Sequence, residues 1–205
     1  MILKQCLRKY FIMGSQDCGK RKPENILIEA INSGITIFQY REKGKGSLSE
    51  KEQLELGKRL RDICLQHDIP FIVNDNVTLV EPLNADGVHV GQNDTPVSIV
   101  RDMFPDKIIG LSISNQAELE QSSLEYVDYV GAGPVFQTMT KPDKTPVGLK
   151  WIETLRHQHP ELPFVGIGGI TSSNATKVLQ AGADGVAVIS AITKANDIKS
   201  VINKL

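Results

Sequence analysis

The chain has 205 residues, of which 40% are hydrophobic and 23% charged, and its 23 Lys and Arg nearly balance its 24 Asp and Glu. This composition is typical of a globular domain and excludes a disordered, collagen-like or disulfide-scaffold class. A net charge of -1 gives no long-range attraction for nucleic acid or an anionic membrane, so neither is an expected partner. Without a long apolar run or a signal-peptide pattern at the start, we expect a cytoplasmic protein.

Short apolar runs alternate along the chain with segments of helical periodicity, which predicts strands that alternate with helices. The expected strands are Tyr10–Met13, Ile35–Tyr40, Phe71–Val73, Gly87–Val90, Ile108–Ile113, Tyr129–Phe136, Phe164–Ile167 and Val186–Ile189. The expected helices are Glu24–Asn32, Leu48–Gln66, Pro96–Phe104, Gln116–Ser122, Leu149–His157, Asn174–Gln180 and Ile198–Asn203. Only the stretch after Phe71–Val73 is too short to predict its structure well.

Eight such units favour a single (β/α)8 TIM barrel over residues 1–205, because helical crossovers give parallel strands that close on themselves. An open doubly wound sheet is the alternative. It would normally have a glycine-rich phosphate turn after its first strand, and the segment from Gly14 to Gly19 lacks that pattern. In a barrel the reacting groups follow the carboxyl ends of the strands, so the residues after each apolar run are the candidates.

Helix ends and cysteines give three smaller predictions. Ser47 followed by Glu50 predicts a capping box at a helix start. Gly34 and Gly182 follow their helices and suit left-handed exits. The three cysteines, Cys6, Cys18 and Cys64, are odd in number and lack metal-ligand spacing, so we expect buried thiols and no disulfide framework.

The second expected strand runs into Gln39-Tyr40-Arg41-Glu42-Lys43. Side chains alternate along a strand, so Gln39, Arg41 and Lys43 share one face, which changes from apolar to basic. The planar fork of Arg and the compact charge of Lys together suit neighbouring phosphoryl groups. The alternative is a solvated charge cluster that pairs with Glu42, but the position at the end of a strand favours a binding function.

Two carboxylates follow adjacent strands, Asp75 after the third and Asp94 after the fourth. Hard oxygen ligands of this kind suit magnesium, which completes its shell with water and substrate phosphates. Each Asp alone is also explained by turn chemistry, but the pair favours one magnesium site. His89, an isolated histidine among valines, is predicted to be a hydrogen-bonded structural residue.

The last strands carry small residues and glycines. Ser112 and Ser114 lie on the fifth strand, and the loop after the sixth contains Thr138 to Lys141, which offers hydroxyl and ammonium donors to an anion. A surface loop is the alternative there. The segments 166–171 and 185–191 end strands seven and eight, where many barrels bind phosphate with backbone amides and a short helix. We therefore predict two anion sites at one barrel mouth.

These segments resemble the thiamine phosphate synthase family, and the resemblance spans essentially the whole chain. The segments that carry it are Gln39–Lys43, Val73–Asp75, Asp86–Asp94, Gly110–Ser112, Gly131–Lys141, Gly166–Ile170 and Ala183–Ile192. The resemblance implies a transferase of thiamine biosynthesis. It would join 4-amino-2-methyl-5-hydroxymethylpyrimidine diphosphate to 4-methyl-5-(2-phosphoethyl)thiazole, or its carboxylated form, and release diphosphate by a dissociative, magnesium-assisted substitution.

The resemblance also implies roles for single residues. The pyrimidine diphosphate would contact Gln39, Tyr40, Arg41, Glu42, Lys43, Asn74, Ser112 and Lys141, with catalytic roles for Arg41, Lys43, Ser112 and Lys141. The thiazole phosphate would contact Thr138, Met139, Thr140, Gly169, Ile189 and Ser190. Asp75 and Asp94 would hold one Mg²⁺ ion. Closure of the Thr138 to Thr145 loop over the ligands is expected because a reactive cation needs protection from water.

Two positions depart from the family pattern, and two other functions compete. Asn76 stands where the family commonly has Arg, and Ile113-Ser114 replaces an Ala-His pair. A thiazole tautomerase of the same superfamily typically lacks the paired metal acids and the Thr-x-Thr-Lys loop. A non-catalytic sensor of thiamine precursors would bind without releasing diphosphate. The expected partners are small-molecule substrates, and a homo-oligomer is left open.

Overall fold

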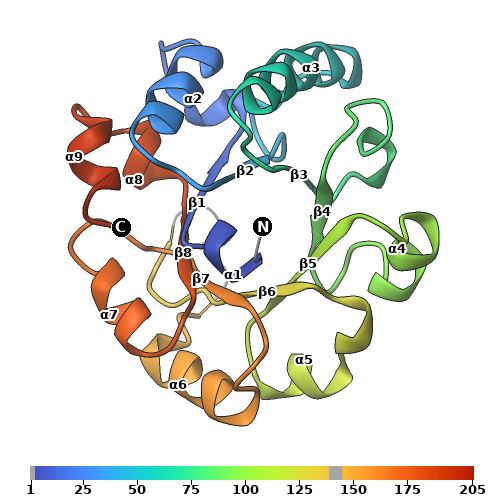
Figure 1. The fold of residues 1–205 in the computed structure, drawn as a ribbon, viewed down its shortest axis with the longest axis vertical. Coiled ribbons are helices and arrows are strands. Elements are labelled where there is room, and N and C mark those ends of the chain that lie inside the picture. The colour runs from blue at the N-terminus through green and yellow to red at the C-terminus, as the bar shows by residue number, and fades with distance from the viewer. Residues whose placement is uncertain (1–2, 139–144) are drawn as a thin grey trace.

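A computed structural model describes residues 3–138 and 145–205 of the chain, which form a closed barrel of eight parallel strands (Figure 1). The strands are β1 (Lys9–Met13), β2 (Ile37–Tyr40), β3 (Phe71–Asn74), β4 (Gly87–Val90), β5 (Ile108–Ile113), β6 (Tyr129–Ala132), β7 (Phe164–Ile167) and β8 (Gly185–Val188). They pair in chain order and β8 closes the ring on β1. The predicted (β/α)8 barrel is confirmed, and the open doubly wound sheet is excluded.

Helices surround the barrel, and α1 lies across its opening in Figure 1. They are α1 (Leu3–Cys6), α2 (Pro23–Asn32), α3 (Glu50–Gln66), α4 (Val97–Met103), α5 (Gln116–Gln121), α6 (Gly148–Gln158), α7 (Ala175–Gln180), α8 (Ser190–Thr193) and α9 (Ile198–Ile202). Short 3-10 turns lie at η1 (Ser15–Asp17), η2 (Val77–Leu79) and η3 (Leu124–Tyr126). No described helix is long and apolar enough to cross a membrane.

Both surfaces of the barrel wall are buried, as parallel strands require. Tyr10, Ile37 and Tyr129 point into the barrel, whereas neighbours such as Phe11 and Phe38 point outward into the layer beneath the helices. The rings of Phe11 and Phe38 pack with centroids 5.6 Å apart, which continues this outer layer from β1 to β2. The period-two alternation therefore decides which side chains reach the interior.

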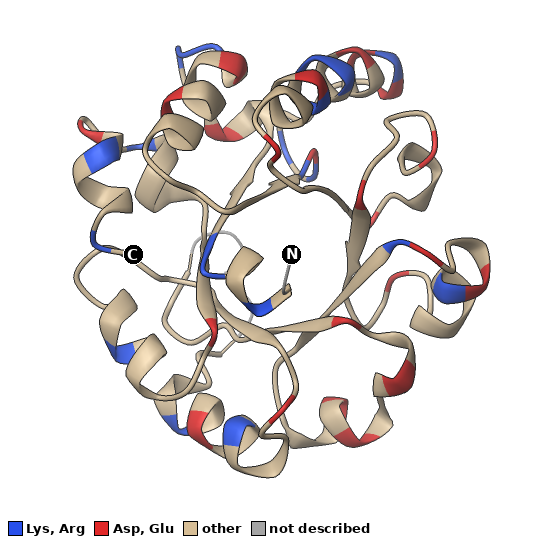
Figure 2. Cartoon of the chain, viewed as in Figure 1, with Lys and Arg blue, Asp and Glu red and all other residues tan. Residues whose placement is uncertain are grey.

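Charges of both signs lie on the outer surface, and Figure 2 shows basic and acidic residues side by side along α3.

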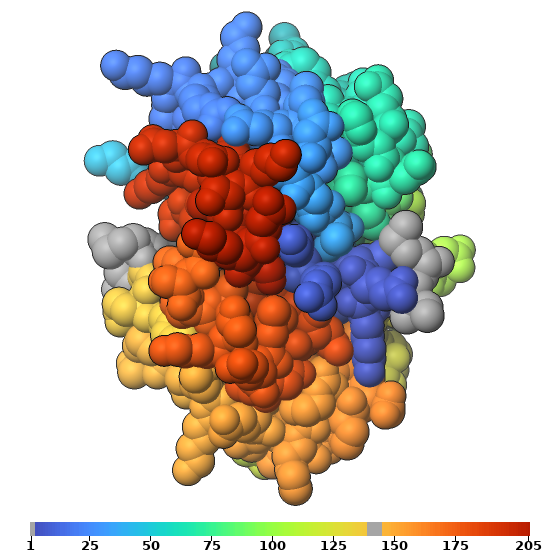
Figure 3. Space-filling model, turned by 60° about the vertical axis from the view of Figure 1, so that its left-hand side comes forward, coloured from blue at the N-terminus to red at the C-terminus, as the bar shows by residue number. Residues whose placement is uncertain are grey.

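The two ends of the described chain lie next to each other on the outer surface. Figure 3 shows the C-terminal segment in red packed beside the blue N-terminal segment. The Lys9 ammonium donates to the carbonyl of Ile202 at 2.7 Å, which ties β1 to α9. The three cysteines are buried, as expected.

The element bounds agree with the predictions to about two residues, except at the end of β6. The predicted run to Phe136 is wrong, because the strand ends at Ala132 and a cis bond joins Gly133 to Pro134. Pro134 has no amide hydrogen for the ladder. The amides of Val135 and Phe136 still donate to the carbonyls of Ile167, which ends β7, and of Gly168, at 2.8 and 3.1 Å.

The capping prediction at α3 is also wrong by two residues. The helix begins at Glu50 with Ser49 as its N-cap, and the Glu52 carboxylate accepts from the Ser49 amide at 3.1 Å. Ser47 instead donates its hydroxyl to the carbonyl of Gly44 at 2.9 Å, within the preceding loop. Gly34 and Gly182 have φ of 97° and 112°, so the left-handed exits are confirmed.

At the amino ends of the strands, a side chain before every second strand accepts a hydrogen bond from a backbone amide of the preceding strand, and we call each such bond a fastening. The residue before β4, β6 or β8 is an Asp whose carboxylate accepts from a backbone amide of the preceding strand. These bonds join Asp86 to Phe71 at 2.7 Å, Asp128 to Ile109 at 2.8 Å and Asp184 to Phe164 at 2.9 Å. Before β2 the hydroxyl of Thr36 takes the place of the carboxylate and accepts from the Lys9 amide at 2.9 Å.

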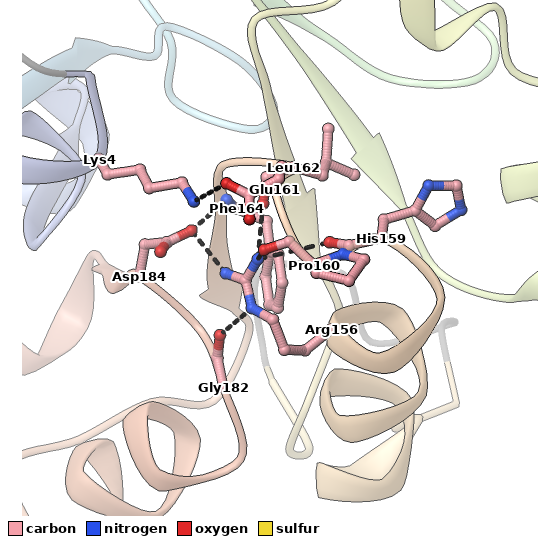
Figure 4. Close-up of polar contacts among 9 residues, drawn as sticks. All are labelled: Lys4, Arg156, His159, Pro160, Glu161, Leu162, Phe164, Gly182 and Asp184. Carbon is pink, nitrogen blue, oxygen red and sulfur yellow. Dashed lines mark hydrogen bonds and ion pairs between the residues drawn. The ribbon is translucent and has the colours of Figure 1, made fainter.

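An arginine completes each of the three Asp fastenings, and we call these sets the Arg–Asp clamps. The pairs are Arg61 with Asp86 at 3.1 Å, Arg101 with Asp128 at 2.7 Å and Arg156 with Asp184 at 2.7 Å. Figure 4 shows the third clamp, in which Arg156 also donates to the carbonyls of Gly182 and Pro160 at 2.8 and 2.7 Å. Its guanidinium lies 4.4 Å from the centre of the Phe164 ring.

We expect Asp184→Ala to lower the free energy of unfolding by about 2–3 kcal/mol, because it leaves a mostly buried guanidinium and an amide without their acceptor. The side chains of Arg156 and Asp184 are only 22% and 17% exposed, so water compensates little. For a chain of this size the melting temperature should fall by roughly 5–10 °C. Asp184→Asn keeps an acceptor oxygen for the Phe164 amide and should lose less. Equal melting temperatures for wild type and Asp184→Ala would contradict the clamp.

Candidate active site

The second strand places its alternate side chains as predicted. Gln39 points into the barrel, where it is 2% exposed and donates to the Tyr10 hydroxyl at 2.8 Å. Tyr40 points outward, and its hydroxyl donates to the carbonyl of Gln53 in α3 at 3.0 Å. The Tyr40 ring therefore lies between the barrel and α3, away from the mouth. Its side chain is not placed to contact a ligand there.

Arg41 follows directly after β2, where its backbone is held on both sides. Its amide donates to the Met13 carbonyl at 3.0 Å, and its carbonyl accepts from the Gln16 amide group at 2.9 Å. Within residues 3–138 and 145–205, no carboxylate lies within 4 Å of the guanidinium. The backbone is fixed while the cationic group stays available to an anion.

Glu42, a predicted ligand contact, connects loops at the mouth. One carboxylate oxygen accepts from the backbone amide of Ser15, and the other accepts from the Ser15 hydroxyl at 3.0 Å and the Leu48 amide at 3.1 Å. The side chain thereby ties the loop after β1 to the loop that leads into α3. A direct contact between Glu42 and a ligand stays a prediction.

Lys43, Asp75 and Asp94 converge from three different loops. The Lys43 ammonium forms an ion pair with the Asp75 carboxylate and lies 3.7 Å from an oxygen of Asp94. Asp75 has a φ of 56°, and its amide donates to the carbonyl of His89 at 2.8 Å. Asp94 accepts from the Gly91 amide at 2.8 Å, which fixes its carboxylate in its own turn. The structure thus brings the two predicted metal ligands together.

Burial raises the pKa of Asp75, the Lys43 hydrogen bond opposes this, and the negative charge of Asp94 adds to it. The hydrogen bond to Asp75 in turn raises the pKa of Lys43, so the ammonium form is favoured beside the carboxylates. Two carboxylates this close repel each other unless a cation lies between them. Lys43 supplies that positive charge here, and a divalent ion would supply more.

The donor set suits magnesium more than a transition metal. Both side-chain donors are carboxylate oxygens, which are hard ligands. Among the described residues no cluster of three or more His, Cys, Asp or Glu side chains could hold a metal ion. A cation at Asp75 and Asp94 would therefore need water or substrate oxygens for the rest of its shell, as magnesium in phosphate sites usually does.

Ser112 and His89 meet inside the barrel. Ser112 on β5 is a predicted catalytic residue, and its hydroxyl lies 2.9 Å from Nε2 of His89. Nδ1 of His89 lies 3.0 Å from the hydroxyl of Tyr129, so both ring nitrogens are hydrogen-bonded, as predicted for this residue. That its partner would be a candidate site residue was not predicted from the sequence.

Asn74 and Asn76 lie at the end of β3. Asn74 is the last residue of the strand, two positions after the inward-facing Ile72, so it shares the inward face. Asn76, the first departure from the family pattern, accepts from the Thr78 amide at 3.2 Å as the N-cap of η2. At the second departure, the amide of Ser114 donates to the Glu118 carboxylate at 2.6 Å.

The ends of β7 and β8 form a glycine-lined turn beside a short helix. Gly168 and Gly169 have φ of 85° and 66°, and a Cβ on Gly169 would lie 2.4 Å from the carbonyl oxygen of Gln137. On the adjacent strand, Ile189 and Ser190 lead into α8, which the sequence analysis did not predict. The first amides of a helix have no intrahelical acceptor, which suits an anion.

The loop after β6 carries four predicted site residues. Thr138 is half-buried at the end of the described segment. Met139, Thr140 and Lys141 lie outside the described residues, as does most of the predicted Thr138 to Thr145 loop. Their contacts with either substrate stay predictions.

A cavity of about 650 Å³ lies at the opposite end of the barrel. Leu3 of α1 lines it, together with Arg61, Asp86, Arg101 and Asp128 of two Arg–Asp clamps. These arginines and aspartates are already paired with one another. Their charges are used to fasten strands, so we place the candidate active site at the carboxyl ends.

Comparison with known proteins identifies the family to which the sequence is similar. The family model described as thiamine monophosphate synthase matches residues 9–192. A thiamine-phosphate synthase of Oceanobacillus iheyensis is 58% identical over 203 residues, which is 98% of this chain and 98% of that protein. One of Streptococcus agalactiae is 45% identical and covers 99% of this chain and 92% of its own length. A solved thiamine phosphate pyrophosphorylase of Pyrococcus furiosus superposes with a TM-score of 0.87 at 33% identity, covering 99% of this chain and 95% of that one.

Proposed function

The chain belongs to the thiamine monophosphate synthase family, and we propose that it joins its two substrates at the mouth formed by the carboxyl ends of the strands. It is a transferase that makes thiamine phosphate. The comparisons favour neither a thiazole tautomerase nor a sensor. The observation that carries the proposed site is the convergence of Lys43, Asp75 and Asp94. Arg41 follows the same strand as Lys43, and among the described residues no carboxylate lies within 4 Å of its guanidinium.

The reaction breaks one bond and forms one. The bond between the pyrimidine methylene carbon and the diphosphate oxygen breaks, and its electron pair leaves with the diphosphate. The methylene cation that remains is delocalised by the aminopyrimidine ring. The thiazole nitrogen then donates its lone pair to the methylene carbon, which gives thiamine phosphate. No protein nucleophile is needed, so the protein acts by positioning the substrates and stabilising charge.

We propose that the protein binds one Mg²⁺ through Asp75 and Asp94, whose two oxygen-donor side chains fit this ion. When bound, the ion neutralises negative charge on the departing diphosphate. Lys43 already contacts both carboxylates and would share the diphosphate with them. Arg41 offers a planar fork of donors to the same group.

Two further residues would orient the pyrimidine diphosphate. Gln39 lies on the inward face of β2, two residues before Arg41. Its side-chain amide is buried and already donates to the Tyr10 hydroxyl. Ser112 lies on β5 across the barrel, with its hydroxyl bonded to His89. The two side chains would define where the pyrimidine lies relative to the cations. The glycine-lined turn at Gly169 with Ser190 would receive the thiazole phosphate.

The test is diphosphate release from the pyrimidine diphosphate by purified protein, with and without magnesium and the thiazole phosphate, while thiamine phosphate is assayed in parallel. We expect thiamine phosphate only when both substrates and magnesium are present. Binding without diphosphate release would indicate a sensor. Interconversion of thiazole tautomers without condensation would indicate the isomerase.

Ser190→Glu should raise the KM for the thiazole phosphate by about tenfold or more, because it places a carboxylate where a phosphate is expected. Ser190 is exposed at the start of α8, so the substitution should not disturb the core. The KM for the pyrimidine diphosphate should change much less. Ser200→Glu, at an exposed position of α9, is the matched control. An unchanged KM for the thiazole phosphate in Ser190→Glu would contradict the phosphate site.

A further inference from the structure

A continuous chain of hydrogen bonds crosses the barrel interior between two candidate substrate contacts, and we call it the interior chain. It runs from Gln39 through Tyr10, Tyr129 and His89 to Ser112. Gln39 lies 2.8 Å from the Tyr10 hydroxyl, which lies 2.7 Å from the Tyr129 hydroxyl. That hydroxyl lies 3.0 Å from Nδ1 of His89, whose Nε2 lies 2.9 Å from the Ser112 hydroxyl.

Two glycines make room for this arrangement. His89 on β4, Gly110 on β5 and Tyr129 on β6 lie in one register row. A Cβ on Gly110 would lie 2.4 Å from Nδ1 of His89 and 2.5 Å from the Tyr129 hydroxyl, so a side chain there would separate the two groups. Gly131, the partner of Ser112 in the register, would place a Cβ 3.1 Å from the His89 ring. The missing side chain on β5 lets β4 and β6 bond across it.

Either phenol could donate in the bond between Tyr10 and Tyr129, but only the direction from Gln39 toward His89 gives the proton of each buried phenol an acceptor within the interior chain. Burial raises the pKa of both Tyr10 and Tyr129, so both hydroxyls stay protonated at neutral pH. The amide nitrogen of Gln39 donates to Tyr10, which leaves the Tyr10 proton for Tyr129. Tyr129 then has its own proton for Nδ1 of His89.

The donors at His89 and Ser112 follow from this direction. With Nδ1 accepting, the neutral imidazole has its proton on Nε2, which donates to the Ser112 hydroxyl. The Ser112 oxygen therefore accepts from inside the barrel. Its own proton is left to donate in another direction, and the carboxyl end of β5 opens toward the mouth.

We propose that the interior chain orients the Ser112 hydroxyl as a hydrogen-bond donor to the pyrimidine diphosphate, so that His89 and Tyr129 are positioning residues for the transfer. This inference rests on the proposed function for its substrate. The serine keeps its proton throughout, and its hydrogen bond strengthens as negative charge develops on the departing oxygen. The interior chain also links Gln39 to Ser112. One hydrogen-bonded network would thus orient both of these side chains toward the pyrimidine diphosphate.

The first test is the tautomer of His89, which does not depend on activity. Two-bond proton–nitrogen NMR spectra of the labelled protein distinguish a proton on Nε2 from one on Nδ1, and loss of the signal in His89→Gln assigns it among the four histidines. We expect the Nε2 proton in the wild type and a mixture of tautomers in Tyr129→Phe. A wild-type proton on Nδ1 would overturn the inference.

The second test is a double-mutant cycle with diphosphate release as the readout. Tyr129→Phe should lower kcat by about tenfold, the usual scale for a group that orients a reacting residue, while the KM for the thiazole phosphate changes little. In a Ser112→Ala background Tyr129→Phe should have almost no further effect on kcat, because the Ser112 hydroxyl that Tyr129 orients is absent. The same tenfold loss in both backgrounds would overturn the inference.

Matched variants separate positioning from folding. Tyr126→Phe removes a phenol in η3, in the layer outside the barrel, and should leave kcat unchanged. Tyr10→Phe should cost less than Tyr129→Phe, because Tyr129 can still donate to His89. Melting temperatures show whether each variant is folded. A wild type that binds the pyrimidine diphosphate without releasing diphosphate would refute the proposed function, whereas the tautomer still decides the inference.

Discussion

Asp75→Asn is expected to lower kcat/KM for thiamine phosphate formation by at least about a hundredfold, more than the loss of a residue that only supports a metal ligand. The substitution keeps the shape of the side chain and removes the charge that would hold magnesium. Among residues 3–138 and 145–205, it also leaves Lys43 with one carboxylate within 4 Å, that of Asp94 at 3.7 Å. The magnesium concentration for half-maximal rate should rise together with the loss of rate. Rates at several magnesium concentrations measure both effects.

Asp68→Asn is a matched control for this variant. Asp68 and Asp75 have nearly the same left-handed backbone, with φ of 55° and 56°, and asparagine tolerates that conformation. Asp68 lines the cavity at the opposite end of the barrel, so its replacement should leave the rate unchanged. Asp94→Asn should resemble Asp75→Asn. Wild-type magnesium dependence in both variants would refute the metal site.

Gly169→Ala is expected to lower the free energy of unfolding by about 3–5 kcal/mol and to abolish most binding of the thiazole phosphate. Its φ of 66° is costly for any residue with a Cβ. The new Cβ would also lie 2.4 Å from the Gln137 carbonyl oxygen and 2.8 Å from Phe136, and backbone atoms cannot move aside cheaply. Thermal unfolding measures the first effect, and the KM for the thiazole phosphate measures the second.

Gly19→Ala separates the two contributions. Gly19 has a similar φ of 60°, but no described atom lies within 4 Å of the position of a Cβ. In Gly19→Ala the free energy of unfolding should therefore fall by only about 1–2 kcal/mol, the cost of the left-handed backbone, and the KM should stay at the wild-type value. If Gly169→Ala lost no more stability than Gly19→Ala, the close approach of the β6 and β7 loops would be disproved.

The barrel was predictable because both faces of its strands are buried, so eight apolar runs stand out between polar helices. Two kinds of element were not predictable from the sequence. The helices α1 and α8 have only four residues each, which is too short for helical periodicity. At β6 the apolar run continues past Ala132 along the end of β7 without strand geometry, and composition cannot distinguish the two.

The candidate site was predicted as separate segments rather than as a network. The alternation along β2 correctly placed Gln39 and Tyr40 on opposite faces of the strand. The contact of Tyr10 with Tyr129 joins positions 119 residues apart, and nothing local to either indicates the other. A usable signal was present nonetheless. His89 and Ser112 are polar residues at inward positions of buried strands, where each must find a hydrogen-bond partner.

The fastenings at the amino ends of the strands divide the barrel into four pairs. Each joins an odd-numbered strand to the next even-numbered one, through Thr36 or through the aspartate of an Arg–Asp clamp. None of these four crosses from an even-numbered strand to the following odd one. The ring therefore has four strand boundaries that no fastening crosses. A break in the polypeptide at any of these boundaries would leave all four fastenings intact. The first and last described residues flank one of them, between β8 and β1.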